Sequence, residues 1–150
     1  MRCLALAQAW QETGAQVFLL TAGLPTPLQA RLENEDLDVI SLSAVPGSIA
    51  DATETVDCAR QHGASWIVVD GYHFDAAYQQ HIKAAGLRLL YIDDCGYAGD
   101  YTADIVLNQN IFAGEQLYPS RAAYTQLLLG TRYALLRREF RAWHTRQRET

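Results

Sequence analysis

The chain has 150 residues, of which 49% are hydrophobic and 19% are charged, and it carries a formal net charge of −5. This composition is typical of a globular protein with a sizeable core, and the acidic balance argues against a broad basic surface for nucleic acid. No stretch of 18 apolar residues occurs, so the sequence predicts no membrane span.

Further features of the composition favour the cytoplasm. Gln8, Gln11 and Glu12 interrupt the apolar start of the chain too early for an export signal. The three cysteines are widely separated and lack zinc-binding spacing, which fits reduced thiols. We therefore expect a cytoplasmic protein with no metal, no cofactor, and neither a nucleic acid nor a membrane as partner.

The charge is unevenly distributed along the chain. Residues 132–150 contain six arginines against two glutamates, a local charge of +4, whereas the remainder sums to −9. An arginine-rich terminal helix is more often a solvated face or a linker than a binding surface.

The predicted elements alternate along the chain. We expect helices over residues 1–12, 26–33, 51–62, 75–85 and 135–147, and strands over 15–21, 37–42, 66–70, 87–92, 104–107 and 126–129. The first helix places Cys3, Leu6, Ala7 and Trp10 on one apolar face, and the third, capped by Ser48 or Asp51, does the same with Ala52, Val56 and Ala59. The alternation predicts βαβ units and an α/β fold, a Rossmann-like parallel sheet sandwich.

The start of the chain departs from this plan. A doubly wound domain normally opens with a strand and a glycine-rich turn, whereas this sequence opens on a helix. We interpret this as loss of the central strand, which would lie between the strands at Val17 and Ile67. Two open sheet edges would follow, and we expect weak stability, aggregation or dimerisation unless something fills the gap.

Three apolar runs between Trp66 and Asn110 each end in polar or glycine residues. The clusters are Asp70-Gly71-Tyr72, Asp93-Asp94 and Asn108-Gln109-Asn110. Ligands of open parallel sheets bind beyond the carboxyl ends of the strands. These clusters are therefore where we expect binding or chemistry.

Each cluster has a functional and a purely structural interpretation. Gly71 would allow a tight turn that lifts Tyr72 over the sheet edge, where its ring would contact a small ligand or pack against a loop. Successive side chains of a strand point to opposite faces, so one of Asp93 and Asp94 would cap the following loop and the other would face a ligand, unless both are loop caps.

The amides and the histidines leave similar alternatives. Asn108 and Asn110 are suited to recognising sugar hydroxyl and acetamido groups, or they build a turn. His73 is the histidine near these clusters, and a loop histidine is more often simply exposed. The sequence contains no dinucleotide-binding glycine motif, P-loop, nucleophile elbow or zinc-protease motif, so it supplies no complete catalytic set.

Five segments together resemble a known enzyme family. They cover residues 1–10, 69–72, 92–94, 103–110 and 129–140, and the last, Leu-Gly-Thr-Arg-Tyr-Ala-Leu-Leu-Arg-Arg-Glu-Phe, is the most specific. They resemble the UDP-2,4-diacetamido-2,4,6-trideoxy-β-L-altropyranose hydrolases of pseudaminic acid biosynthesis. The resemblance implies the N-terminal half of a glycosyltransferase-B-type fold, and an activity that releases UDP from this nucleotide sugar.

The resemblance also implies site residues. Tyr72 matches a tyrosine implicated at the active site of the family, and Asp94 and Asn108 match positions at strand ends that face the cleft. Arg2 is expected to be structural. The water-activating histidine of the family falls before the position of Met1, so we expect no catalytic residue within the chain.

The resemblance further implies the domain organisation. Residues 1–134 would form the sugar-side domain without its first strand, and residues 135–150 would lead toward a C-terminal nucleotide-binding domain. We expect the chain alone to be inactive or nearly so, and to take a UDP-sugar as ligand and a separately encoded second domain as partner. The alternatives are half of a glycosyltransferase that acts on a UDP-sugar, and a non-catalytic sugar-binding subunit.

Overall fold

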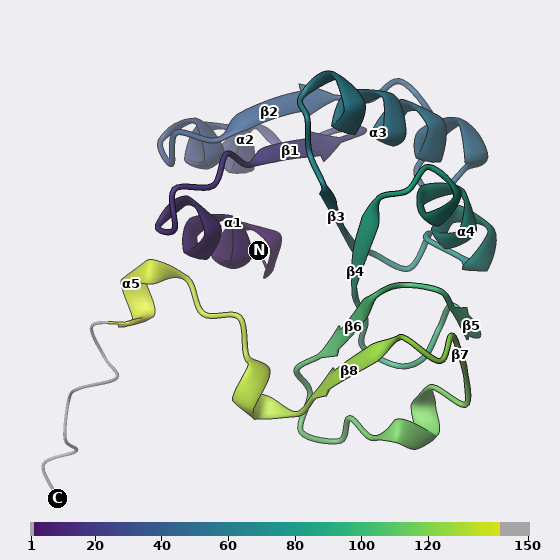
Figure 1. Ribbon diagram of the computed structural model, residues 1–150. Coiled ribbons are helices and arrows are strands. Elements are labelled where there is room, and N and C mark those ends of the chain that lie inside the picture. Colours follow the sequence, from purple (N-terminus) through teal and green to yellow (C-terminus); the bar gives the residue numbers. More distant parts are fainter. Residues whose placement is uncertain (1, 142–150) are drawn as a thin grey trace, which may run out of the picture. The chain divides into compact units, whose positions relative to one another are not determined.

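The computed structural model describes residues 2–141, which fold as two compact units (Figure 1). The first unit contains the chain up to Ile40 and the segment that begins at Leu135. The second unit runs from Ser41 to Ala134.

The first unit is built from a short βαβ segment and flanking helices. In chain order it has α1 (Arg2–Gln11), β1 (Phe18–Thr21), α2 (Thr26–Glu33), β2 (Asp38–Ser41), whose last residue opens the second unit, and α5 (Arg138–Arg141). The strands β1 and β2 form a two-stranded sheet, and their arrows run the same way in Figure 1. The core comprises Leu4, Ala7, Leu32 and Leu37.

The buried face of α1 differs from the predicted one. Leu4, Ala7 and Gln8 are buried, whereas Cys3, Leu6 and Trp10 are only half-buried, so of the four predicted residues only Ala7 is in the core. Gln8 can be buried on this face because both ends of its side-chain amide form hydrogen bonds. Gln8 Nε2 donates to Glu35 at 2.8 Å, and Gln8 Oε1 accepts from the backbone N–H of Arg138 at 2.9 Å.

The second unit contains a four-stranded, fully parallel sheet in the order β3-β4-β6-β8. Its elements are α3 (Ile49–Gln61), β3 (Trp66–Asp70), α4 (Ala76–Ala84), β4 (Arg88–Ile92), β5 (Asp100–Tyr101), β6 (Ile105–Asn108), η1 (Glu115–Leu117), β7 (Ser120–Arg121), β8 (Gln126–Leu129) and η2 (Thr131–Tyr133). The predicted α/β fold with parallel strands is confirmed. The two-residue strands β5 and β7, which pair with each other, were not predicted.

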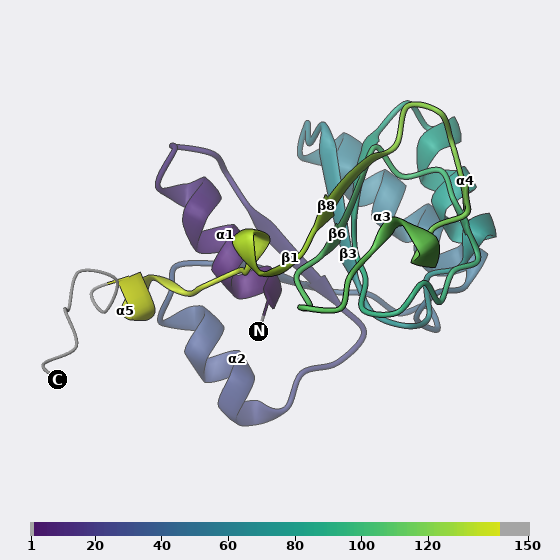
Figure 2. The same ribbon diagram turned by 90° about the horizontal axis from the view of Figure 1, so that it is seen from below.

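Helices α3 and α4 pack on one face of this sheet, as Figure 2 shows from below. The predicted face of α3 is confirmed, because Ala52, Val56 and Ala59 are all buried in the core with Tyr78 and Ile82 of α4. On the sheet side the core is formed by alternate strand residues, which are Val69, Leu89, Tyr91 and Val106.

The N-terminus of α3 uses both of its predicted capping residues. Ser48 is the N-cap and accepts a hydrogen bond from the N–H of Asp51 at 3.1 Å. The Asp51 carboxylate reaches back to the N–H of Gly47 at 2.7 Å. One first-turn N–H of the helix, and one N–H of the loop before it, are thereby satisfied.

Strand β3 lies at the end of its sheet. Among the described residues it pairs with β4, and no strand lies on its other side; β1 likewise pairs with β2 alone. The predicted loss of a central strand is not tested by these two separate sheets and stays a prediction. The predicted consequences for stability stay a prediction.

The end of the chain begins its helix later than predicted. The expected helix over residues 135–147 starts at Arg138 in the structure, and its predicted part from residue 142 onward lies outside the described residues. Within residues 2–141, the structure contains no helix that is long and apolar enough to cross a bilayer.

Candidate functional site

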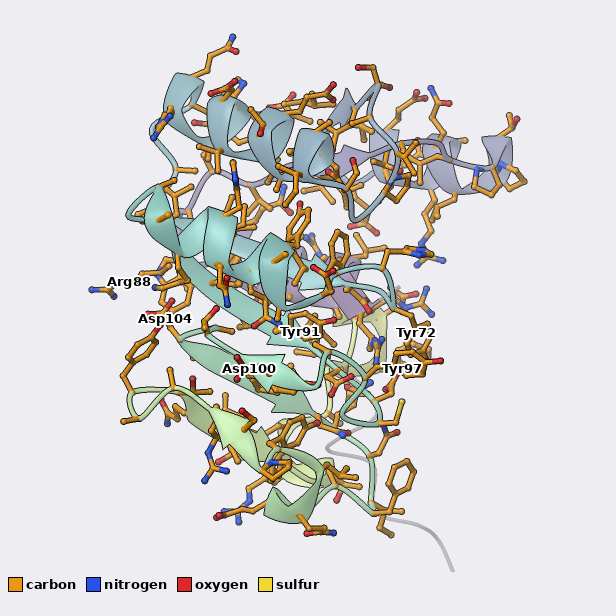
Figure 3. All side chains as sticks on the ribbon, turned by 90° about the vertical axis from the view of Figure 1, so that its right-hand side faces the viewer. Tyr72, Arg88, Tyr91, Tyr97, Asp100 and Asp104 are labelled. Carbon is orange, nitrogen blue, oxygen red and sulfur yellow. The ribbon has the colours of Figure 1, made fainter. Side chains whose placement is uncertain are left out.

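The three predicted clusters meet at the carboxyl edge of the β3-β4-β6-β8 sheet. Tyr72 follows β3, Asp94 follows β4, and Asn108 ends β6. In Figure 3, Tyr72 and Tyr97 lie together beyond the ends of the strand arrows, whereas Arg88 and Asp104 lie at the opposite end of the sheet. Parallel pairing brings these three strand ends to one edge, which is why residues far apart in sequence become neighbours.

The Asp94 carboxylate is held on both of its oxygens. The Tyr72 hydroxyl donates to Oδ2 at 3.0 Å, and Asn110 Nδ2 donates to Oδ1 at 2.9 Å. Tyr72 is 61% exposed and Asp94 is half-buried. The arrangement sets a carboxylate, a phenol and an amide side by side at an accessible strand end, a group that is suited to binding hydroxyl and amide groups.

Asn108 lies behind this group and is fully buried. Its Nδ2 donates to the Asp94 carbonyl at 3.0 Å and to the Tyr118 hydroxyl at 2.9 Å. Its Oδ1 accepts from both the backbone N–H and the side chain of Asn110, at 3.1 and 3.0 Å. The asparagine turn considered in the sequence analysis is therefore present. The structure engages both ends of the Asn108 amide in positioning Asp94 and Asn110.

Asp93 closes the loop that follows β4. Its carboxylate is buried and accepts from the N–H groups of Cys95 and Gly96, at 3.4 and 2.8 Å, and from the Tyr101 hydroxyl at 2.8 Å. One aspartate thus caps the loop, as in the first of the predicted alternatives, and the ligand-facing role of the other stays a prediction. Asp93 caps the loop, and Asp94 lies at the accessible edge.

Three buried phenols surround Asp93. Tyr91, Tyr101 and Tyr118 stack edge to face, with ring centroids 5.6 and 5.1 Å apart for the two successive pairs. Burial, followed by the negative charge and hydrogen bonding of Asp93, raises the pKa of Tyr101 far above its usual value. Burial likewise raises the pKa of Tyr91 and Tyr118. All three stay neutral at ordinary pH and keep their hydroxyl protons for donation.

The loop after β3 turns directly at Gly71 and Tyr72, and Tyr72 is exposed, as predicted. Gly71 does not have a positive φ; a Cβ there would lie 3.3 Å from the Phe74 ring, so the reason for glycine at this position is close packing. His73 is exposed, and its ring contacts Phe74 edge on, with centroids 6.5 Å apart. Gly47, at φ +79°, lies directly against the His73 carbonyl, so the loop before α3 packs closely on the loop after β3.

Two residues of this edge were missed as individual candidates. Tyr97 is 71% exposed, and its ring centroid lies 5.7 Å from that of Tyr72. Its signal in the sequence is a tyrosine in a short loop between two glycines, Gly96 and Gly99, directly after a buried strand. Asn110 was considered only with its motif, and its bond to Asp94 depends on the fold of the β6 end.

The opposite edge of the sheet carries a structural ion pair. Lys83 Nζ lies 2.7 Å from Asp104 Oδ2, which also accepts from the N–H of Leu89 at 2.7 Å. Partial burial alone would raise the pKa of Asp104, but the hydrogen bonds and charge of Lys83, with the Leu89 N–H, outweigh it and lower the pKa. In the described part of the chain, no group of three or more histidine, cysteine, aspartate or glutamate residues is placed to hold a metal ion.

Comparison with known proteins bears on the fold. The comparisons with protein-family models and with curated proteins give no match. Among solved structures, the chain is similar to MurG of Acinetobacter baumannii, with a TM-score of 0.56 and 16% sequence identity over 84% of this chain. The match covers 40% of the MurG chain, so this chain spans less than half of that protein. The likeness shows an α/β fold that resembles the N-terminal half of a glycosyltransferase-B-type enzyme.

Proposed function

We propose that this chain is the sugar-facing part of an enzyme that hydrolyses a nucleotide sugar, UDP-2,4-diacetamido-2,4,6-trideoxy-β-L-altropyranose, in pseudaminic acid biosynthesis. The observation that supports it most is the Asp94 carboxylate held between Tyr72 and Asn110 at the carboxyl edge of the sheet. Carboxylate and amide groups bind the hydroxyl and acetamido groups of such a sugar through charge-assisted and neutral hydrogen bonds.

The proposed roles follow the geometry. Tyr72 and Asp94 contact the sugar, and Asn108 acts from behind by orienting Asp94 and Asn110, since it is buried. Water attacks the anomeric carbon and UDP leaves as the diphosphate. The general base and the groups that bind the nucleotide are supplied by parts of the enzyme other than these residues, including a second domain.

Saturation-transfer NMR with the intact nucleotide sugar tests this proposal. We expect saturation of the acetamido and C6 methyl protons to exceed that of the uracil protons, because the chain contacts the sugar. UDP alone is the matched control and should show little transfer. Saturation strongest on the uracil ring, or no transfer at all, would contradict the proposal.

Variants and an activity assay extend the test. Asp94→Asn should weaken binding about 10-fold, as expected for loss of a charge-assisted hydrogen bond worth about 1.5 kcal/mol. We expect UDP release by these 150 residues alone to be far slower than by a complete enzyme of this kind, because the proposal assigns them no general base, a group that commonly contributes about 10²–10⁴-fold.

The second candidate is half of a glycosyltransferase that acts on a UDP-sugar. The specific support is the fold match to MurG. Mass-spectrometric product analysis, with and without an acceptor and with a second domain added, separates the two. A free sugar as sole product supports hydrolysis, whereas a glycoside formed only with acceptor supports transfer.

A further inference from the structure

Two exposed aromatic rings stand beside the Asp94 group. Tyr72 and Tyr97 are 61% and 71% exposed, and their ring centroids are 5.7 Å apart at an interplanar angle of 60°. Figure 3 shows both at the carboxyl end of the strands. Single exposed aromatic residues are common on protein surfaces. Here the two rings contact each other, and the Tyr72 hydroxyl bonds to Asp94, so the surface has both apolar and hydrogen-bonding character.

The loop that carries Tyr97 is fixed on both sides of the ring. Before it, the Asp93 carboxylate holds the N–H of Gly96 at 2.8 Å; after it, the N–H of Ala98 donates to the Tyr101 hydroxyl at 3.3 Å. Gly96 has φ +77°, and a Cβ there would lie 2.5 Å from the Leu117 carbonyl oxygen. The loop backbone is therefore held on both sides of Tyr97, whose side chain is exposed.

A hydrogen-bond acceptor lies on the other side of the Asp94 carboxylate from the Tyr72 hydroxyl. Asn110 uses its Nδ2 on Asp94 and Asn108. Among the described residues, its Oδ1 accepts no hydrogen bond, and this oxygen is not buried away from solvent. An amide oxygen in this position accepts from a hydroxyl or amide N–H of a ligand.

We propose that Tyr72 and Tyr97 form a stacking platform for the apolar face of the pyranose ring, and that Asn110 Oδ1 accepts from an amide N–H or hydroxyl of the same ring. This inference rests on the proposed function and adds Tyr97 and Asn110 as specificity-determining residues. A deoxysugar presents C–H groups on a ring face and a methyl group at C6, which pack against aromatic rings.

The angle between the rings favours a sugar over a nucleobase. A flat base stacks on parallel aromatic faces, whereas the two tyrosine rings are inclined by 60°. A puckered pyranose directs its C–H groups along different axes, so it contacts both inclined rings at once.

The test compares Tyr97→Ala with Tyr97→Phe in the full chain. The probe is UDP-2,4-diacetamido-2,4,6-trideoxy-β-L-altropyranose, titrated by saturation-transfer NMR. We expect Tyr97→Ala to weaken binding about 2- to 10-fold, the range for loss of one aromatic contact, and to reduce saturation of the sugar ring and C6 methyl protons. Tyr97→Phe keeps the ring and should bind within about 2-fold of the unmodified chain.

The matched control is Tyr124→Ala. Tyr124 is also an exposed tyrosine of the second unit, but it precedes β8 and so lies at the opposite edge of the sheet. Binding should be unchanged in this variant. Each variant is checked for an unaltered melting temperature, since a fold defect would lower binding for another reason.

The outcomes separate this inference from the proposed function. If the unmodified chain does not bind the probe, the proposed function fails. If it binds through the sugar and Tyr97→Ala binds equally well, the platform alone is refuted. If Tyr97→Ala reduces saturation of the uracil protons instead, the platform holds a nucleobase and the sugar assignment is wrong.

Discussion

Replacing Tyr101 with phenylalanine tests how the Tyr97 loop is held. The Tyr101 hydroxyl donates to the buried Asp93 carboxylate at 2.8 Å and accepts from the N–H of Ala98 at 3.3 Å. Phenylalanine removes both hydrogen bonds but keeps the ring, and therefore the edge-to-face contacts with Tyr91 and Tyr118. The substitution should therefore change stability only through the loss of these two hydrogen bonds.

The expected cost follows from the chemistry of the lost bonds. A hydrogen bond to a charged group contributes about 1.5–3 kcal/mol, and the carboxylate that loses its donor is only 4% exposed, so water does not readily replace it. We expect the free energy of unfolding of Tyr101→Phe to fall by about 2–3 kcal/mol. This is a large share of the roughly 5–15 kcal/mol of a typical domain.

Urea denaturation followed by far-UV circular dichroism measures this change. The m-value should stay the same, because the surface exposed on unfolding is unchanged. Hydrogen exchange supplies a local readout: the amides of Gly96 and Ala98 should exchange faster in Tyr101→Phe.

Tyr124→Phe is the control for the loss of a phenol. Its hydroxyl donates to the Thr102 carbonyl at 2.9 Å on an exposed surface, so we expect a loss of only about 0.5 kcal/mol. If Tyr101→Phe cost no more than this control, the Tyr101 hydroxyl would contribute nothing beyond an exposed phenol to holding the loop.

Three further predictions concern stability. Burial raises the pKa of the buried tyrosines in the folded state, to about 12 for Tyr78, above the value of about 10 in the unfolded chain. Above about pH 10 the free energy of unfolding should therefore fall by up to about 1.4 kcal/mol per pH unit for each buried tyrosine. Equal urea midpoints at pH 9 and 11.5 would contradict this. Asp104→Asn should cost about 1.5–3 kcal/mol, because Lys83 loses its carboxylate partner and keeps only the Leu87 carbonyl. The pKa of the Asp104 carboxyl is lowered, so its contribution to stability should be lost only as pH falls below 3.8; a penalty that persists unchanged at pH 2 would refute the ion pair as its source. Gly47→Ala should destabilise the protein more than Gly63→Ala in the same urea assay. Both glycines have a positive φ, which costs an alanine about 1–2 kcal/mol, but of the two only Gly47 would place a Cβ against a backbone carbonyl. Equal losses of stability would exclude that contact.

Much of the second unit was predictable from local pattern. The run from Trp66 to Asp70 is a strand with the predicted bounds, and Ser48 caps α3 as expected. Such features depend on residues within about one helical turn of each other, or on an unbroken apolar run, so the sequence alone contains their cause. The meeting of three strand ends also followed, because parallel pairing sets a common carboxyl edge.

The first helix shows where local pattern misleads. Periodicity favoured a face with Cys3 and Trp10, but the buried face contains Gln8. Its amide is satisfied by Glu35 and by the backbone of Arg138, 27 and 130 residues away in sequence. A hydrophobicity pattern predicts that a glutamine is exposed, because it considers only neighbouring residues and not the distant groups that bond to the amide.

By itself, the sequence determined the alternation of strands and helices, the parallel sheet, and the polar clusters that follow its strand ends. Only the tertiary structure decided what each polar residue does there. It buried Asn108 behind the edge, assigned Asp93 to the loop and Asp94 to the accessible group, and set Tyr97 beside Tyr72. The physical reason is that hydrogen-bond partners and ring contacts at this edge join residues on different strands, and their geometry exists only once the strands are paired.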